Sequence, residues 1–361
     1  MSLAAFLRRF RRVLAAAIAL AAAVTATAGC GAAGGEPYTE DLFAMDTFMR
    51  LSAYGRFAEA AVRAASDEIK RLDAAWSVTD GDSEIYALNS FGRAEVSPET
   101  LEIINFAVSV SGETAGALDI TVYPAVSAWG FTTGEYRVPD DGELSAIAPL
   151  VDCGAVKLGE TSVELAPGAA VDLGALAKGY ASQRAAEIFK ERGVTSGVVS
   201  LGGNVQTLGR KPDGSLWSVA IQDPEDGERY AGALGTSDAA VVTSGVYQRY
   251  FEAGGRRYHH IIDPATCRPA ESGLLSVTVV ADNGARADAL STALFVMGRQ
   301  AAETYWRESG RDFDMILITE DGEVYITDGI AGSYTHINTE RELIALTAPQ
   351  RPAQPGVQTE G

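Results

Sequence analysis

Hydrophobic and polar positions alternate along the chain with two periods, one typical of helices and one typical of strands. The helical period predicts helices over residues 56–73, 97–115, 174–192, 285–298 and 299–309. The two-residue period predicts strands over 42–53, 161–165, 196–201, 216–222, 240–243, 258–262, 274–281, 313–319 and 323–327. Several predicted strands follow one another without a helix, as in 196–222 and 240–281. We therefore expect an α+β fold with substantial antiparallel sheet and flanking helices, not a doubly wound one.

The segment 171–193, VDLGALAKGYASQRAAEIFKERG, has the clearest helical pattern and one unusual residue. Asp172 stands where a helix entry is capped, and Gly193 stands where a helix stops. Lys178 falls in the first turn, where the helix dipole favours anions and disfavours cations. A lysine followed by a glycine at this end of a helix therefore needs an explanation beyond local helix stability.

Both ends of the chain differ in composition from its centre. Residues 1–29 have a basic start, an apolar run and small residues before Cys30, which is typical of a lipoprotein signal peptide with Cys30 lipidated. An ordinary secretory peptide is the alternative. Residues 30–37 form a small-residue linker, and the Pro/Gln-rich tail at 347–361 is expected to be disordered. One continuous globular domain is expected over 38–346.

The net charge of the chain limits the classes of binding partner that are expected. The chain has 29 Lys and Arg against 48 Asp and Glu, a net charge of −19. Residues 1–29 hold four arginines and no acids, so the net charge without them is lower by four, at −23. Such an acidic protein is not expected to bind nucleic acid. An anionic ligand would need a metal ion, a helix N-terminus or a few lysines to hold it locally.

The cysteines do not form a pattern typical of a zinc site. If Cys30 is lipidated, Cys153 and Cys267 remain, and no pair or cluster has the spacing of a zinc site. A disulfide between them is one alternative. Two unpaired, buried thiols are the preferred interpretation.

Four segments carry residues suited to chemistry, and each also has a plain structural interpretation. In DNGARADALSTALFVMG (282–298), Asp288 and Thr292 lie one helical turn apart and offer oxygen ligands for Mg²⁺ or Ca²⁺. An exposed Asp beside a Thr bonded to its own backbone is the commoner case. In SGVVSLGGNVQTLG (196–209), Gly202 and Gly203 indicate a hairpin turn or a close backbone approach to a ligand.

Two of the chain's three histidines stand in RYHHIIDPATCRP (257–269). A regular strand would point His259 and His260 to opposite faces, and one of them could accept a proton near neutral pH. A histidine bonded to a carbonyl is an equally good interpretation. In LDITVYPAVSAWGF (118–131), aromatic residues near Asp119 and Thr121 suit either a core segment or a flat heteroaromatic ligand.

Six blocks taken in order resemble the ApbE family of FAD:protein FMN transferases: AMDTFMRL, LDITVYPAVSAWGF, VDLGALAKGYA, VVSLGGNVQTLG, YHHIIDPATCRP and ADALSTALFVMG. The resemblance covers about residues 40–335 and implies the family's α+β fold. It also implies a lipoprotein outside the cytoplasm, anchored to the bacterial membrane, that binds FAD and Mg²⁺. Such proteins attach FMN through a phosphoester to a Thr or Ser of a partner protein and release AMP. The family's acceptors include subunits of the sodium-pumping NADH:quinone reductase and of Rnf-type complexes.

The same resemblance implies roles for individual residues. FAD contacts are implied for Met45, Thr79, Asp119, Thr121, Asp172, Lys178 and Ile262. Metal ligands are implied for the Asp288 and Thr292 side chains and the Ala175 carbonyl. We hypothesise that His260 or Asp263 accepts the proton of the acceptor hydroxyl. In this reading Lys178 meets the charge of a pyrophosphate, which explains its place at a helix N-terminus.

The chain departs from the family pattern at three of these places. Thr79 stands where relatives often carry Tyr, Asp46 stands where Gly is frequent, and Cys267 replaces the Gly of DPxTG. These changes leave open the balance between transfer and hydrolysis. The same residues suit two alternative functions: an FAD pyrophosphatase that yields FMN and AMP, and a non-catalytic FAD-binding lipoprotein.

Overall fold

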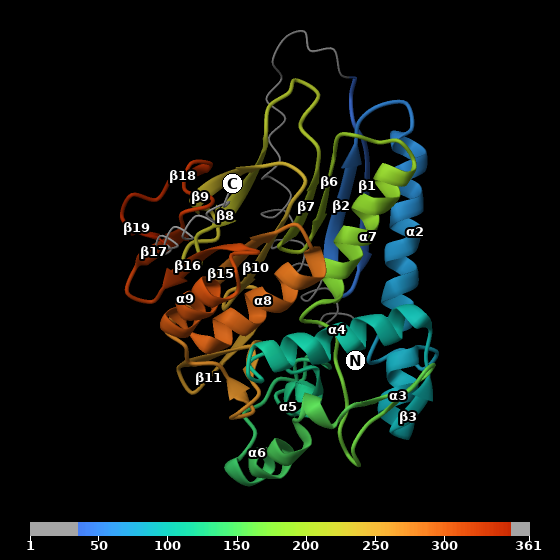
Figure 1. Ribbon diagram of the computed structural model, residues 1–361. Helices are drawn as coiled ribbons and strands as arrows, with labels where there is room; N and C mark the ends of the chain where they lie inside the picture. The colour runs from blue at the N-terminus through green and yellow to red at the C-terminus, as the bar shows by residue number, and fades with distance from the viewer. Residues whose placement is uncertain (1–34, 348–361) are drawn as a thin grey trace, which may run out of the picture.

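The computed structural model describes residues 35–347. The predicted signal peptide, Cys30 and most of the predicted linker and tail lie outside these residues. A nine-stranded sheet crosses the whole protein (Figure 1). Its strands, in spatial order, are β1 (Tyr38–Ala44), β2 (Thr47–Ala53), β6 (Gly197–Leu201), β7 (Asn204–Leu208), β10 (Ala240–Gly245), β15 (Leu274–Ala281), β16 (Asp314–Thr319), β17 (Glu323–Thr327) and β19 (Glu342–Leu346). Neighbours run antiparallel except β17 and β19, which are parallel.

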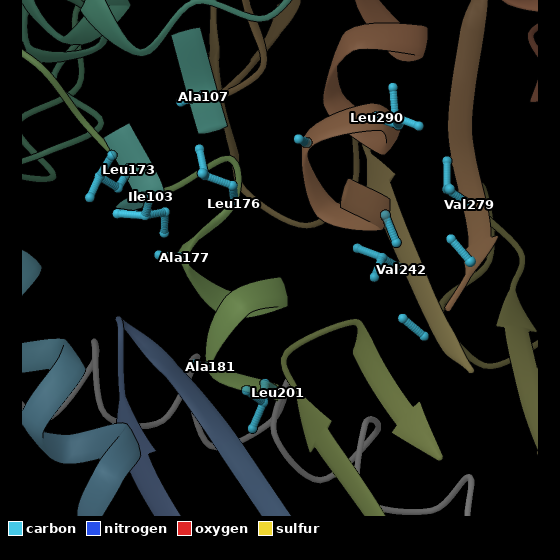
Figure 2. Close-up of a cluster of buried hydrophobic side chains, with 14 of the residues drawn as sticks. Ile103, Ala107, Leu173, Leu176, Ala177, Ala181, Leu201, Val242, Val279 and Leu290 are labelled. Atoms are coloured by element: carbon cyan, nitrogen blue, oxygen red, sulfur yellow. The ribbon is translucent and has the colours of Figure 1, made fainter. Parts of the chain in front are cut away.

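Helices cover one face of this sheet. Helix α2 (Ala58–Trp76) packs on β1 and β2, α7 (Ala177–Glu191) on β6 and β7, and α8 (Gly284–Met297) on β10 and β15. Helix α9 (Arg299–Glu308) follows α8 and packs on β16. The main core fills the space between these layers. Figure 2 shows its side chains coming from segments far apart in sequence, among them Leu201 of β6, Val242 of β10 and Leu290 of α8.

A smaller sheet covers part of the opposite face. Strands β8 (Trp217–Gln222), β9 (Tyr230–Thr236) and β18 (Tyr334–His336) form it. Their apolar side chains meet those of β10, β16 and β17 in a second core. Strands β15 and β16 are therefore buried on both faces, which explains why LLSVTVVA and DMILIT read as nearly continuous apolar runs.

The remaining elements gather at the end of the main sheet where β1 turns into β2 (Figure 1). The helices are α3 (Glu84–Phe91), α4 (Pro98–Glu113), α5 (Tyr123–Ala128) and α6 (Asp141–Ile147). The strands are β3 (Arg93–Glu95), β4 (Lys157–Leu158), β5 (Ser162–Glu164), β11 (Tyr250–Ala253), β12 (Arg256–His259), β13 (Ile262–Asp263) and β14 (Arg268–Pro269). Trp129, Phe131, Ile262 and Cys267 belong to a third cluster of buried side chains, which joins α5 and α6 to β13.

The five predicted helices and the α+β class are observed, with differences in detail. The predicted strand 42–53 is a hairpin, because Met45 and Asp46 both adopt left-handed backbone angles, with φ of 47° and 56°. Aspartate tolerates this conformation, but no glycine or proline marked the turn. The predicted strand 258–262 is interrupted after His259. Helices α3, α5 and α6 and strands β3, β4, β9, β11, β14, β18 and β19 were not predicted.

The third predicted helix starts later than its sequence indicates. It begins at Ala177, so Asp172 is not its N-cap. The Asp172 side chain instead accepts a hydrogen bond from the amide of Gly174, at 2.7 Å. Lys178 does lie in the first turn, and Gly193 ends the helix with a φ of 79°, as its pattern predicts.

Within the described residues, no helix is both long enough and apolar enough to span a membrane. Cys153 and Cys267 are unpaired and buried, which confirms the preferred interpretation of these two residues.

Candidate active site

A cavity of about 460 Å³ opens where the β1–β2 turn, the starts of α7 and α8 and the end of β10 converge. Ten of the residues singled out from the sequence line it: Met45, Thr79, Asp119, Asp172, Ala175, Lys178, His260, Ile262, Asp288 and Thr292. Thr121 and Asp263 do not. The tertiary structure thus brings together residues from segments spread over nearly 250 positions.

The first turns of α7 and α8 touch through two glycines. A Cβ atom added to Gly179 would lie 2.1 Å from the carbonyl oxygen of Gly284, and one added to Gly284 would lie 2.4 Å from that of Gly179. This contact lets the Gly179 amide donate a hydrogen bond to Oδ2 of Asp288, at 2.8 Å. The glycine after Lys178 therefore joins the two helices at the cavity.

Lys178 lies at the same corner. Its Nζ donates to the carbonyl oxygen of Gly174, at 3.0 Å, and it lines the cavity together with Ala175. The pKa values of the Asp172 and Asp288 carboxylates are raised above the usual range, because both groups are buried. The positive charge of Lys178 opposes this rise but is the smaller effect.

Asp288 is a buried carboxylate without an ion pair among the described residues. It is 4% exposed, and no Lys, Arg or His nitrogen of the described chain lies within 4.0 Å of its oxygens. Thr292 lies one turn further along α8, and its Oγ1 is 3.3 Å from Oγ of Ser244 on β10. A buried carboxylate of this kind requires compensation by hydrogen bonds or a cation.

The two neighbouring histidines have different environments. His259 is 8% exposed, its Nε2 lies 3.0 Å from the carbonyl oxygen of Ala270, and its ring meets Phe295 edge-on. His260 lines the cavity, and its Nδ1 lies 3.1 Å from the carbonyl oxygen of Arg249. Because a carbonyl can only accept, Nδ1 carries the hydrogen and Nε2 keeps a free lone pair. Burial, aided by the charge of Arg249, lowers the pKa of His260 to about 3.

Asp263 does not reach the cavity. Its Oδ1 accepts from the amide of Ala265, at 2.9 Å, and its Oδ2 accepts from Oγ1 of Thr266, at 3.0 Å. Both carboxylate oxygens thus stabilise the turn between β13 and β14. In that turn Cys267 takes a left-handed φ of 56°, the conformation that a glycine would adopt most easily. Of the two candidates for a proton acceptor, the geometry favours His260 and disfavours Asp263.

Thr121 also lies behind the cavity wall. It is 1% exposed, and its amide and Oγ1 both donate to Oδ1 of Asp119, at 2.7 and 2.5 Å. Oγ1 of Thr121 in turn accepts from the amide of Asp152, at 2.8 Å. Thr121 therefore holds Asp119, which does line the cavity, whereas its own hydroxyl is already bonded, so the geometry does not favour the FAD contact that the resemblance implies for it.

Several lining residues were missed in the sequence. Arg249 lines the cavity, and its guanidinium donates to the carbonyl oxygen of Phe131. Asp73 of α2 accepts from the amide of Met45, at 2.9 Å. Neither belongs to a local motif. Ser244 was detectable in principle, because the apolar run AAVVTSG ends abruptly in two hydroxyls and a glycine.

Negative side chains outnumber positive ones around the cavity. Five carboxylates line it: Asp46, Asp73, Asp119, Asp172 and Asp288. Lys178 and Arg249 are the two cationic side chains among the described lining residues. The described chain contains no cluster of three or more His, Cys, Asp or Glu residues arranged to hold a metal ion. An anionic ligand would therefore enter an acidic site, where a divalent cation bound with it would offset the repulsion.

Comparison with known proteins identifies the family. The sequence matches the ApbE family over residues 45–317. It is 36% identical over 249 residues to an FAD:protein FMN transferase of Vibrio cholerae, covering 67% of this chain and 74% of the relative. It is 33% identical over 303 residues to an FAD:protein FMN transferase of Salmonella typhimurium, covering 78% and 84%.

Structural comparison agrees with the sequence match. The crystal structure of the ApbE protein of Thermotoga maritima superposes with a TM-score of 0.79 at 31% identity, covering 82% of this chain and 99% of that one. The sequence match over residues 45–317 includes the cavity and the elements that build it, from the β1–β2 turn to β16. This chain is a member of the ApbE family.

Proposed function

We propose that this protein transfers FMN from FAD to a Thr or Ser hydroxyl of an acceptor protein, through a phosphoester bond and with release of AMP. The observation that carries the proposal is that Lys178, Asp288 and Thr292 line one corner of the cavity, where the Gly179 amide holds Asp288. Two relatives that cover most of this chain are named FAD:protein FMN transferases.

Mg²⁺ fits the oxygen groups at this corner. Asp288 and Thr292 supply a carboxylate and a hydroxyl, and Ala175 supplies a carbonyl in the same wall of the cavity. Mg²⁺ is commonly bound by one or two carboxylates together with substrate phosphates and water, a set that Asp288 and a bound pyrophosphate would supply. When bound, the ion would neutralise charge on the phosphate oxygens during cleavage. The buried carboxylate of Asp288, which accepts from the Gly179 amide and has no ion pair among the described residues, supports this assignment.

The rest of the cavity suits the remaining parts of FAD. The half-buried side chains of Val122 and Val126 line it with apolar surface, which a flat heteroaromatic ring can cover, and the buried Phe131 and Ile262 lie beside them in the wall. Thr79 and Asp119 add polar groups to the wall. A volume of about 460 Å³ lies within the range of small-molecule sites.

The chain's own groups can carry the proton. The acceptor oxygen attacks the phosphorus atom of the FMN half, and the bond from that phosphorus to the bridging oxygen breaks. AMP leaves with the bridging oxygen, and the hydroxyl proton passes to Nε2 of His260. The low pKa of His260 keeps Nε2 unprotonated at neutral pH. Phosphates bound beside the ring would raise that pKa, because an anion favours the imidazolium form.

One experiment separates the candidate functions. The protein is incubated with FAD, Mg²⁺ and an acceptor with a flavinylation Thr or Ser, such as a subunit of the sodium-pumping NADH:quinone reductase or an Rnf-type complex. We expect FMN to appear on the acceptor by mass spectrometry, and Asp288→Ala to lower the rate at least ~100-fold, as for other losses of charge stabilisation. Thr207→Val, which removes a buried hydroxyl of β7 outside the cavity, is the matched control.

The other outcomes are equally informative. Free FMN and AMP without labelled acceptor would indicate an FAD pyrophosphatase. FAD binding without turnover would indicate a binding protein. A fully active Asp288→Ala variant would contradict the metal site.

We further propose that the protein is lipid-anchored at Cys30 on the outer side of the bacterial membrane. The sequence pattern before Cys30 supports this, and Cys30 lies outside the described residues. Palmitate labelling of the intact chain, lost in Cys30→Ala, would test it. A labelled Cys30→Ala variant would contradict the assignment.

A further inference from the structure

A small group of buried hydroxyls adjoins Thr292, and one of them, that of Ser244, belongs to a residue that also lines the cavity. Oγ of Ser244 on β10 lies 2.8 Å from Oγ of Ser291 and 3.3 Å from Oγ1 of Thr292, both on α8. Ser291 is fully buried and Ser244 is 8% exposed. Oγ of Ser291 also lies 2.8 Å from the carbonyl oxygen of Asp288, one turn earlier on the same helix. The group thus links the backbone of one proposed metal ligand to the side chain of another.

Only one assignment of donors and acceptors satisfies all the hydrogen bonds in this group. Each hydroxyl has one hydrogen to donate. The carbonyl of Asp288 can only accept, so Ser291 gives its hydrogen to that carbonyl. The bond between the two serines must therefore use the hydrogen of Ser244. Ser244 then has none left, so its bond with Thr292 must use the hydrogen of Thr292.

We infer that Ser244 and Ser291 are positioning residues that turn the hydroxyl hydrogen of Thr292 away from the cavity, so that Thr292 presents lone pairs there. An oxygen presented in this way can coordinate a cation but cannot donate to a phosphate. The two serines would thus make Thr292 a ligand for the divalent ion. This inference rests on the proposed function, in which Thr292 binds Mg²⁺.

The order of the hydrogens makes the two serines interdependent. Ser244→Ala leaves Thr292 without its acceptor, so its hydrogen is free to point into the cavity. Ser291→Ala leaves Ser244 with a free hydrogen, which can then be donated to Thr292 and occupy one of its lone pairs. Because Ser291 acts through Ser244, removing both should cost no more than removing Ser244 alone.

Metal binding can be measured without turnover. Mn²⁺ is titrated into the full chain with saturating ADP, which supplies a pyrophosphate but no flavin, and free Mn²⁺ is followed by electron paramagnetic resonance. We expect Ser244→Ala and Ser291→Ala each to weaken Mn²⁺ binding about 10-fold or more, as for other groups that orient metal ligands. The double variant should match Ser244→Ala. Thr207→Val, a buried hydroxyl of β7 that bonds the backbone of Ala239, should bind like the wild type.

Each alternative result has a definite meaning. Wild-type affinity in Ser244→Ala would overturn the inference and leave the proposed function intact. Additive losses in the double variant would also overturn it, because the serines would then act independently. If the wild type and Asp288→Ala were equally unable to bind Mn²⁺, the metal site and this inference would both be wrong. Thermal unfolding of each variant verifies that it is folded.

Discussion

At the residue scale, Gly179 and its neighbour Lys178 are unfavourable for the local helix but are explained by the tertiary structure. A cation in the first turn of a helix opposes the dipole, and a glycine inside a helix lowers its stability. The glycine is explained by the cavity, because Gly179 lets α7 approach Gly284 of α8 closely. Its amide also donates a hydrogen bond to Asp288, which lies 109 positions later. Lys178 then adds the positive charge that an anionic ligand needs in an acidic cavity.

Gly179→Ala should damage both the fold and the site. Its new Cβ would lie 2.6 Å from Cβ of Asp288 as well as against the Gly284 backbone, so the two helices must separate. Forced overpacking of this kind typically costs about 1–3 kcal/mol of unfolding free energy. We expect a lower urea midpoint and weaker Mn²⁺ binding in the same variant.

Gly112→Ala is the matched control for this prediction. Gly112 also lies in a helix, α4, but a Cβ there meets nothing within 4 Å. Alanine should be neutral or stabilise the protein by up to ~1 kcal/mol. Equal effects of the two substitutions would mean that the close approach of α7 and α8 is unimportant.

At the scale of elements, the strand ends around the histidines separate a group that faces the cavity from groups that stabilise the fold. Strand β12 ends at His259, which packs into the core, and the chain then turns His260 to the cavity before β13 begins at Ile262. Asp263 follows directly, but its carboxylate is used by the β13–β14 turn. Residues three positions apart therefore differ in role because the strand is interrupted between them.

Two substitutions should separate these roles. His260→Ala should lower the rate of FMN transfer by about 10²- to 10⁴-fold, the usual contribution of a general base, with a small effect on stability. Asp263→Ala should lower the unfolding free energy by about 1–2 kcal/mol through two lost bonds and leave the transfer rate nearly unchanged. Transfer assays and urea unfolding on both variants measure this. The reverse pattern would restore Asp263 as the proton acceptor.

At the scale of the whole molecule, one buried ion pair joins the small sheet to the C-terminal part of the described chain. Arg341 and Asp223 have side chains 5% and 3% exposed, and the guanidinium donates to both carboxylate oxygens, at 2.9 and 3.1 Å. Burial alone would raise the pKa of Asp223. The bonds from Arg341, Asn338 and the Glu225 amide outweigh it and hold that pKa at about 2.

This ion pair should make the free energy of unfolding depend on pH in the acidic range. The pKa of Asp223 is lower in the folded than in the unfolded protein, so its contribution is complete above pH 3.8 and is lost as the pH falls towards about 2. Arg341→Met should cost about 3–5 kcal/mol at pH 7, because it leaves a buried carboxylate unpaired. That cost should shrink below pH 4, where the unpaired carboxylate takes up a proton.

The control is an exposed pair of the same kind. Lys157 and Glu164 have side chains 75% and 43% exposed, so Lys157→Met should change the unfolding free energy by less than ~1 kcal/mol at any pH. Urea unfolding at pH 7 and pH 3 compares the two variants. A pH-independent cost of Arg341→Met would contradict the role of Asp223.

The sequence by itself determined the five longest helices, most of the main-sheet strands and the candidate residues that carry a local motif. Amphipathic periods predicted α2, α4, α7, α8 and α9, and the i, i+4 spacing of Asp288 and Thr292 placed them on one helical face. Periodicity succeeds best for elements that bury one face, such as α2 and α9, whereas α8, β15 and β16 are buried on most sides and are marked by their apolar content. It failed at the Met45–Asp46 turn, which has no glycine, and at Asp172, whose capping bond goes to Gly174.

Only the tertiary structure decided which of these residues share the cavity. It brought in Arg249 and Asp73, which no local pattern distinguishes from ordinary core or surface residues, and Ser244, which only the abrupt end of an apolar run marks. It left Thr121 and Asp263 outside the cavity lining, with their polar atoms bonded elsewhere. The physical reason is that hydrogen bonds and close contacts depend on positions in space. Gly179 and Asp288 meet because two backbones can approach at a glycine, and no periodicity along the chain records which backbone will be there.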